Sequence, residues 1–174
     1  DTNRAKMKKP IILLLLIALA SSGFSGILKK SIPDRIVVLT FDDATASQYS
    51  VVAPLLKEFG FGGTFFICEF PPNFSDTAKY MNWRQIRELD RMGFEIANHT
   101  QNHPSIGKLS DEKILEQLNY IERKCDSIGI SKPTTFAYPG YSLSLPVLKL
   151  LQEKGYQFAR AGGSRAYDPQ NDHP

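Results

Sequence analysis

Apolar residues follow two different spacings along the chain. Segments with continuous apolar runs alternate with segments in which apolar residues have helical spacing. Continuous runs rich in β-branched and aromatic residues predict buried strands, and they occupy residues 35–41, 63–68, 94–98, 134–138 and 156–160. Between them, apolar residues recur at helical spacing, which predicts helices over residues 47–59, 82–93, 110–129 and 146–155. This alternation predicts right-handed βαβ units and an α/β fold with a parallel sheet.

The polar residues of greatest chemical interest stand where the predicted strands end. They are Asp42 and Asp43 after the first strand, His99 and His103 after the third, Pro139 to Tyr141 after the fourth, and Arg160 at the end of the fifth. In parallel α/β folds the carboxyl ends of the strands meet at one edge, and sites are built there. We therefore expect these residues to converge.

The N-terminal segment has the pattern of an export signal. Met7 and the next lysines precede ten apolar residues, 11–20, and then a run of small, weakly polar residues, which are the three regions of a signal peptide. We predict a signal peptide over residues 7–26, cleaved after Ala20, and interpret residues 1–6 as an upstream artefact. The alternative is an uncleaved membrane anchor. In both cases residues 27–174 form one exported domain, in the periplasm, the cell envelope or the medium.

Composition and charge narrow the class of protein further. With 42% hydrophobic and 22% charged residues, the chain has the balance of a folded globular protein. Of its 21 basic and 18 acidic residues, four basic and one acidic precede Pro10, so the remainder is electrically neutral. A domain without net positive charge lacks the excess of lysine and arginine that binding to phosphates needs, so nucleic acid is not an expected partner. Cys68 and Cys125 fit either one disulfide or two buried thiols.

The carboxylates and imidazoles have the composition of a catalytic metal site. Asp42 and Asp43 are neighbours at a strand end, so one can bind a cation while the other stays free; the alternative is an Asx turn that caps the next helix. His99 and His103 face one ion if the segment makes a helical turn, and otherwise are two surface histidines. One carboxylate and two imidazoles leave a position for water, with the spare carboxylate as general base, which indicates a metal-assisted hydrolase.

Three motifs, in this order and each at a strand end, resemble those of a known family. They are Thr40-Phe41-Asp42-Asp43, His99-Thr100-x-x-His103 and Phe136-Ala137-Tyr138-Pro139-Gly140-Tyr141. Over roughly residues 34–160 the chain resembles the polysaccharide deacetylases of the NodB-homology type, carbohydrate esterase family 4. The resemblance implies a distorted, incomplete (β/α) barrel that removes N- or O-linked acetyl groups from glycans. It also implies one divalent metal, usually zinc, with cobalt and nickel as alternatives.

Matched position by position, the first two motifs receive roles from the resemblance. Asp42 becomes the general base of the reaction. Asp43, His99 and His103 become the ligands of the metal.

The third motif departs from the family pattern. Members commonly carry an arginine that orients the base, but here that position is Ala137. They continue with a proline and an aromatic residue whose backbone N–H faces the oxyanion. The corresponding substrate and oxyanion segment here is Pro139, Gly140 and Tyr141, with the aromatic ring displaced by one position. Arg160, at the end of the next strand, is a candidate replacement for the missing arginine.

The family's later motifs, including a leucine-x-histidine segment that supplies the general acid, have no match in the sequence. We therefore expect this chain to be a C-terminally truncated portion of the domain that is inactive by itself. Two functions remain. The first is metal-dependent removal of acetyl groups, most simply N-acetyl, from a cell-wall or extracellular polysaccharide. The second is inactive glycan binding on the same fold. The complete metal set favours the enzyme, whereas the missing arginine and acid favour the binder.

Overall fold

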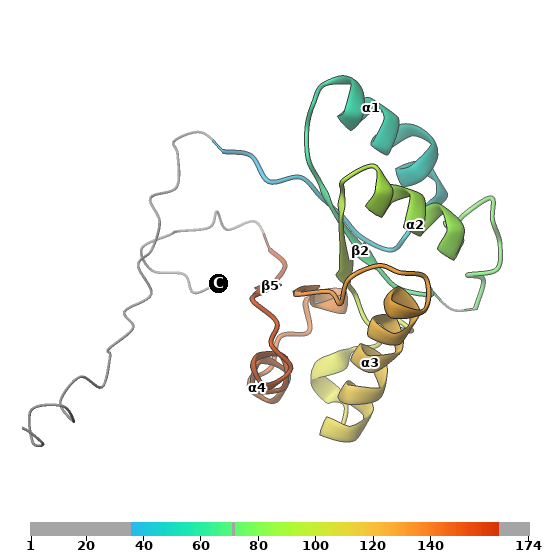
Figure 1. The fold of residues 1–174 in the computed structure, drawn as a ribbon. Helices are drawn as coiled ribbons and strands as arrows, with labels where there is room; N and C mark the ends of the chain where they lie inside the picture. Colours follow the sequence, from blue (N-terminus) through green and yellow to red (C-terminus); the bar gives the residue numbers. More distant parts are fainter. Residues whose placement is uncertain (1–35, 71, 164–174) are drawn as a thin grey trace, which may run out of the picture. The chain divides into compact units, whose positions relative to one another are not determined.

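The computed structural model describes residues 36–70 and 72–163, and the predicted strands and helices occur there in the predicted order. Short π-helical or 3₁₀ segments, labelled η, accompany them. The elements are β1 (Thr40–Phe41), η1 (Gln48–Val52), α1 (Ala53–Glu58), β2 (Thr64–Ile67), α2 (Trp83–Arg91), β3 (Glu95–Asn98), η2 (Ile106–Lys108), α3 (Asp111–Ser127), β4 (Thr135–Ala137), η3 (Pro139–Tyr141), α4 (Leu145–Glu153) and β5 (Phe158–Arg160) (Figure 1).

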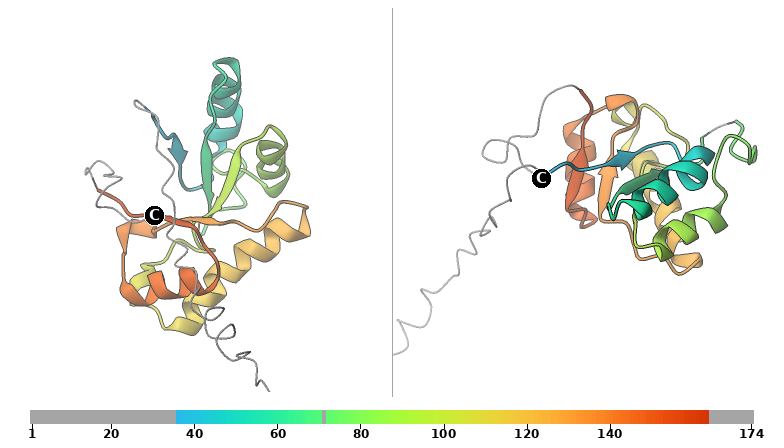
Figure 2. Two further views of the ribbon diagram at one scale, coloured as in Figure 1. Left: turned by 60° about the vertical axis from the view of Figure 1, so that its left-hand side comes forward. Right: turned by 90° about the horizontal axis from the view of Figure 1, so that it is seen from above.

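The five strands form one parallel sheet in the order β1-β2-β3-β4-β5. Each strand therefore pairs with the strand that precedes it in the sequence, and at least one helix lies in every connection. A doubly wound sheet reverses its strand order at one point, and this sheet does not. It curls instead as part of a (β/α) barrel, with the helices outside it (Figures 1 and 2). The predicted α/β, incomplete barrel fold is confirmed.

The helices cover one face of the sheet through two hydrophobic clusters. Strand residues Phe65, Ile67 and Ile96 pack with buried residues of α1, α2 and α3. Phe136 packs with buried residues of α3 and α4 in the second cluster. Burying each such side chain contributes about 1.5–3 kcal/mol, so this face fixes the strands that carry the site.

The opposite face of the sheet, inside the partial barrel, carries small side chains. Ala97 and Ala137 are fully buried there and pack with Phe66. The guanidinium of Arg160 lies over the Phe66 ring, with its Cζ 5.3 Å from the ring centroid. The two alanines therefore leave room for a long cationic side chain at the centre of the fold.

Three helix starts follow the local sequence closely. Asn82 caps α2 in a capping box: its side chain accepts the N–H of Gln85, whose side chain accepts the N–H of Asn82. Ser110 and Ser144 cap α3 and α4 through their side chains. Such a cap contributes about 1 kcal/mol, which explains why these boundaries are readable from sequence.

Two predicted elements differ from the structure. The predicted buried strand at residues 35–41 is wrong in extent, because of its described residues, 36–41, only Thr40 and Phe41 belong to the sheet, while Val37 and Val38 are 79% and 75% exposed. β1 lies at the edge of the sheet, so in the described part of the chain only β2 flanks it. The predicted helix at 47–59 begins as the π-helical turn η1 before α1 continues it.

The predicted export signal, residues 7–26, lies outside the described residues. Among the described helices, none has the length and apolar character needed to span a bilayer. Cys68 and Cys125 are both buried and unpaired with each other, so the two-thiol alternative is the one that the structure contains.

Candidate active site

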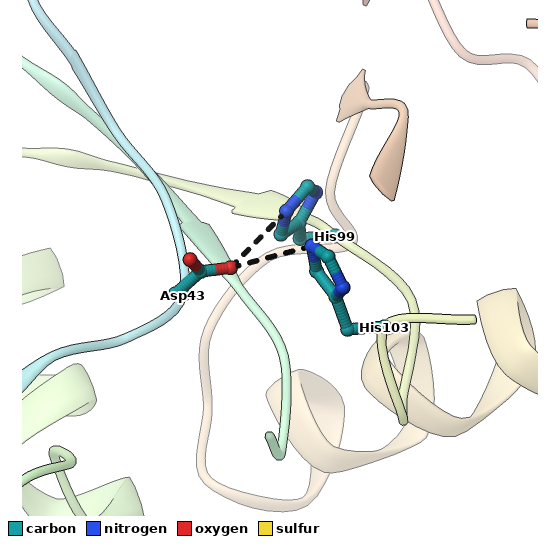
Figure 3. Close-up of side chains that lie close together, drawn as sticks. All are labelled: Asp43, His99 and His103. Atoms are coloured by element: carbon teal, nitrogen blue, oxygen red, sulfur yellow. Dashed lines mark ion pairs between the residues drawn. The ribbon is translucent and has the colours of Figure 1, made fainter. Parts of the chain in front are cut away.

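Asp43, His99 and His103 meet at the carboxyl edge of the sheet. Asp43 follows β1, His99 follows β3, and His103 lies four residues further on (Figure 3). Asp43 Oδ1 lies 3.4 Å from His99 Nε2 and 3.6 Å from His103 Nε2. One ligand atom from each of the three residues lies within 4.8 Å of the other two.

These distances fit a metal ion. Zinc holds imidazole nitrogen and carboxylate oxygen at about 2.0–2.2 Å, so two ligand atoms at a tetrahedral angle are about 3.3–3.5 Å apart. The two separations from Asp43 Oδ1, 3.4 and 3.6 Å, are close to that spacing. Nitrogen and oxygen donors of this kind suit a divalent transition metal. The three residues can therefore hold one such ion with little movement.

A backbone carbonyl fixes the orientation and tautomer of His99. The ring is almost fully buried, and Nδ1 lies 2.8 Å from the Ala137 carbonyl oxygen. Because a carbonyl oxygen only accepts, Nδ1 carries the proton, and in the neutral ring the lone pair is on Nε2, which faces Asp43. This arrangement is typical of metal-ligating histidines.

The surroundings favour the protonation states that metal ligands need. The contact with His99, the largest effect, holds the pKa of the Asp43 carboxyl below its ordinary value, although burial acts in the opposite direction. Burial, followed by the charge of His99, lowers the pKa of His103. An ionised carboxylate and a neutral imidazole are the ligating forms.

The two histidines converge without the helical turn that the sequence made the condition for their facing one ion. That condition is wrong, because residues 99–103 form no helix and both Thr100 and His103 have positive φ, 66° and 50°. Thr100 Oγ1 accepts the N–H of His103 at 3.1 Å, which folds the loop back on itself. The alternative of two surface histidines is also wrong for His99, which is buried.

Backbone strain is concentrated at this edge of the sheet. The described non-glycine residues with positive φ are Asp43, Ala44, Thr100, His103 and Tyr141. All of them follow the carboxyl ends of β1, β3 or β4. A left-handed conformation costs a non-glycine residue about 1–2 kcal/mol, and residues held in it cluster at functional sites.

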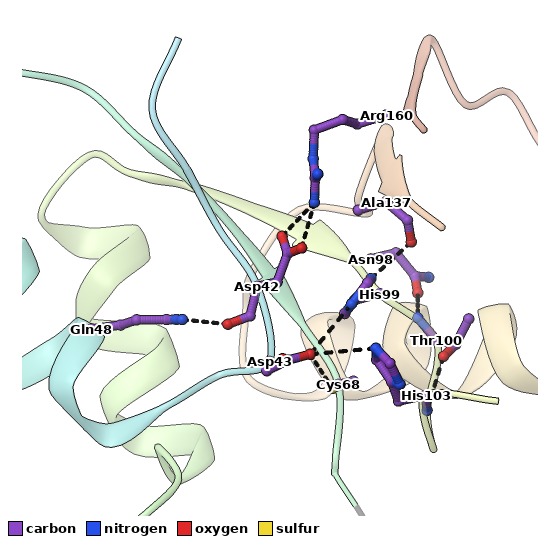
Figure 4. A network of polar contacts seen from close by, with 10 residues as sticks. All are labelled: Asp42, Asp43, Gln48, Cys68, Asn98, His99, Thr100, His103, Ala137 and Arg160. Atoms are coloured by element: carbon purple, nitrogen blue, oxygen red, sulfur yellow. Dashed lines mark hydrogen bonds and ion pairs between the residues drawn. The ribbon is translucent and has the colours of Figure 1, made fainter. Parts of the chain in front are cut away.

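Asp42 turns away from the metal ligands and binds Arg160 instead. Arg160 Nη2 donates to both carboxylate oxygens, at 2.6 Å for Oδ1 (Figure 4). Arg160 pairs in register with Ala137 across β4 and β5, so its side chain comes from the position next to the one where the family commonly has arginine. The Asx-turn alternative does not occur, because among the described residues the hydrogen bonds to the Asp42 and Asp43 carboxylates come from side chains and not from a backbone N–H.

The Pro139–Tyr141 segment forms the short turn η3 beyond β4. Gly140 has φ 54°, a conformation that glycine adopts without strain. The Tyr141 ring is 66% exposed. The Tyr141 N–H donates to the Tyr138 carbonyl at 3.2 Å, so that N–H is engaged within the turn. The assignment of this segment to the oxyanion remains a prediction.

Three residues around the site were not anticipated from the sequence. Gln48 donates through Nε2 to the Asp42 carbonyl and is buried. The Cys68 thiol lies 3.9 Å from Asp43 Oδ1, and burial, the largest effect, raises its pKa strongly. Asn98 accepts the N–H of Thr100 at 2.8 Å. Cys68 and Asn98 each stand at a strand end, which was the available signal.

The fold and the site define a class: parallel (β/α)-barrel proteins with a candidate metal centre at the carboxyl edge of the sheet. The family description "Polysaccharide deacetylase" matches residues 29–159 of the sequence. The chain therefore belongs to the polysaccharide deacetylase family, with NodB homology and of the carbohydrate esterase family 4 type.

One curated relative is the peptidoglycan-N-acetylglucosamine deacetylase of Bacillus cereus. It is 30% identical over 129 residues, which cover 71% of this chain and 55% of the relative. The chain thus spans about half the length of that relative.

Two solved structures share the fold. A de-N-acetylase from Aggregatibacter actinomycetemcomitans has a TM-score of 0.68 and 20% identity, covering 83% of this chain and 70% of the other. A family 4 pseudoenzyme from Bacillus anthracis has a TM-score of 0.62 and 24% identity, covering 74% of this chain and 44% of the other. The same fold therefore carries both a de-N-acetylase and a pseudoenzyme.

Proposed function

We propose that the chain carries the metal centre of an exported hydrolase that removes acetyl groups, chiefly N-acetyl groups, from a cell-wall or extracellular polysaccharide. One observation carries the proposal. Two adjacent carboxylates have different partners: Asp43 lies against two imidazoles, and Asp42 lies against a guanidinium. A hydrolase of this kind needs one carboxylate for the metal and another for the proton. The names of the relatives support the substrate class.

Asp43, His99 and His103 would hold one divalent metal ion. Zinc suits two imidazoles and a carboxylate best, and cobalt and nickel are the alternatives. When bound, the metal supplies a Lewis acid for the acetyl carbonyl and makes water more acidic. The hydrogen bond from His99 Nδ1 to the Ala137 carbonyl keeps Nε2 directed at the ion's position.

Asp42 is the general base in this proposal. Its carboxylate is about one-third exposed, so a water molecule and the substrate can reach it. Arg160 donates to both oxygens, which fixes the orientation of the carboxylate. Asp42 accepts the proton of the water that attacks the acetyl carbonyl. Cleavage of the C–N bond, with transfer of this proton to the leaving nitrogen, then yields an amine and acetic acid, which ionises to acetate.

The turn at Pro139–Tyr141, in which Pro139 is buried and Gly140 and Tyr141 are exposed, is the proposed substrate and oxyanion side of the site. It lies at the end of β4, next to the Ala137 carbonyl that orients His99. The exposed Tyr141 ring offers an apolar face to a sugar. An open edge of this kind suits a polymer that passes across the site.

The experiment uses the complete protein that contains this chain, loaded with zinc and incubated with N-acetylglucosamine oligomers. We expect acetate release that stops when a chelator removes the metal. The matched control is Asp42→Asn, which should retain zinc and release little acetate. If the zinc-loaded wild type bound the oligomers without releasing acetate, the inactive glycan-binding alternative would replace the enzyme.

A further inference from the structure

A chain of hydrogen bonds joins the loop that carries the histidines to Tyr156 of the second hydrophobic cluster and then to Glu122 of α3. It begins at Asn98, the last residue of β3, which is fully buried. Asn98 Nδ2 donates to the Leu118 carbonyl at 3.1 Å and to the Tyr156 hydroxyl oxygen at 2.7 Å. Asn98 Oδ1 accepts the N–H of Thr100 at 2.8 Å. Both ends of the amide are therefore fixed.

Tyr156 continues the chain toward α3. Its hydroxyl donates to Glu122 Oε1 at 3.0 Å, and the other carboxylate oxygen of Glu122 lies 3.0 Å from Lys154 Nζ. Burial, followed by the charge of Glu122, raises the pKa of the Tyr156 phenol, so the hydroxyl remains a donor. The Tyr156 oxygen is thus held on one side by a carboxylate and presents its acceptor side to Asn98.

The contact made by Asn98 Oδ1 bears directly on the strained loop. Thr100 is β-branched and has φ 66°, and His103 has φ 50°. A β-branched residue in this conformation is uncommon and must be held by its surroundings. Two hydrogen bonds hold it here: Asn98 Oδ1 binds the Thr100 N–H, and Thr100 Oγ1 binds the His103 N–H. Relaxation of the loop would change the separation of the two imidazoles.

We propose that Tyr156 is a positioning residue of the metal site, which acts through Asn98 to hold the 99–103 loop in the conformation that brings His99 and His103 together. Tyr156 is 53 positions beyond His103 and touches neither imidazole, so it acts only through the amide. The inference rests on the proposed metal site, although the ordering of the loop is a property of the metal-free chain as well. Losing partners outside the ligand set typically weakens metal binding by about 10- to 100-fold.

The test is Tyr156→Phe, with Tyr138→Phe as its matched control. Both tyrosines are buried in the same hydrophobic cluster, but the Tyr138 hydroxyl has no hydrogen-bond partner among the described residues. Each variant loses one hydroxyl and keeps its ring in the core. The first measurement is hydrogen exchange at the amides of Thr100 and His103 in the metal-free chain. The second is zinc affinity by competition with a chromophoric chelator, together with the visible spectrum of the cobalt-loaded chain.

Tyr156→Phe should accelerate exchange at both amides, weaken zinc binding about tenfold and alter the cobalt spectrum, while Tyr138→Phe should change none of them. Unchanged exchange and affinity in Tyr156→Phe would overturn the inference, and so would equal effects in both variants. If the wild-type chain bound no zinc, the proposed function would fail, and the exchange comparison alone would then decide the role of Tyr156.

Discussion

Replacing Arg160 by methionine tests how the base is oriented. Arg160→Met removes the guanidinium but keeps a long side chain that can pack over Phe66, where the guanidinium lies now. The metal ligands make no contact with Arg160 among the hydrogen bonds and ion pairs of the site. We therefore expect the change to act on Asp42 alone, lowering kcat while zinc stays bound.

The size of the effect follows from the geometry of the contact. Arg160 Nη2 is 2.6 Å from Asp42 Oδ1, and the two side chains are 35% and 32% exposed. Unit charges 4 Å apart interact by about 4 kcal/mol near a protein surface and by about 1 kcal/mol in water. Because solvent reaches this pair, about 1–2 kcal/mol is the appropriate figure. At 1.36 kcal/mol for each factor of ten, kcat should fall about 5- to 30-fold.

The assay is acetate release from N-acetylglucosamine oligomers by the complete protein, with zinc affinity measured in parallel. The double variant with Ala137→Arg and Arg160→Ala is the second variant to measure, because these two positions pair in register across β4 and β5. It should restore part of the lost kcat by returning a guanidinium to the neighbouring strand. The reasoning fails if Arg160→Met keeps the wild-type kcat, or if zinc affinity falls as much as kcat does.

The remaining predictions concern the ligands and a buried thiol. Asp42→Asn should keep zinc but lower deacetylation by roughly 10²–10⁴, whereas Asp43→Asn should weaken zinc binding; the opposite pattern would exchange their roles. A variant with both His99→Ala and His103→Ala should contain no zinc by metal analysis, and wild-type stoichiometry would contradict the site. Burial, the main cause, raises the pKa of Cys125 from 9.0 to about 12. The unfolded chain therefore ionises first, so stability is retained below pH 9 and falls as pH rises toward 12. Urea unfolding across this range should show a shallower loss in Cys125→Ala, and equal slopes would refute the assignment.

Local features of the fold were predictable from sequence because their causes are local. The cap at Asn82 and the helical spacing of α3 depend on residues within one or two turns. The convergence of Asp43 and His99 was also predictable, since the carboxyl ends of all strands in a parallel sheet lie at one edge. The contact of Arg160 with Asp42 was a hypothesis from the position of Arg160 beside Ala137, and it joins the first and last strands of the curled sheet.

The differences arise where packing partners decide the conformation. The run at 35–41 has the composition of a buried strand, but only its last two residues enter the sheet, because β1 lies at its edge. The loop at 99–103 keeps its left-handed residues through hydrogen bonds within the loop and to Asn98. Asn98 in turn depends on Tyr156, which is 58 positions away. No spacing rule along the sequence reveals a contact of that kind.

The strand order also determines when each part of the site can form during synthesis. Every strand pairs with the one made just before it, so the growing chain can add one βα unit at a time, and such near-neighbour contacts favour rapid folding. The three proposed metal ligands have all left the ribosome once residue 103 has emerged. The contact between Asp42 and Arg160 joins residues 118 positions apart. Among the described residues of the site, Asp42 is therefore the last to gain its partner.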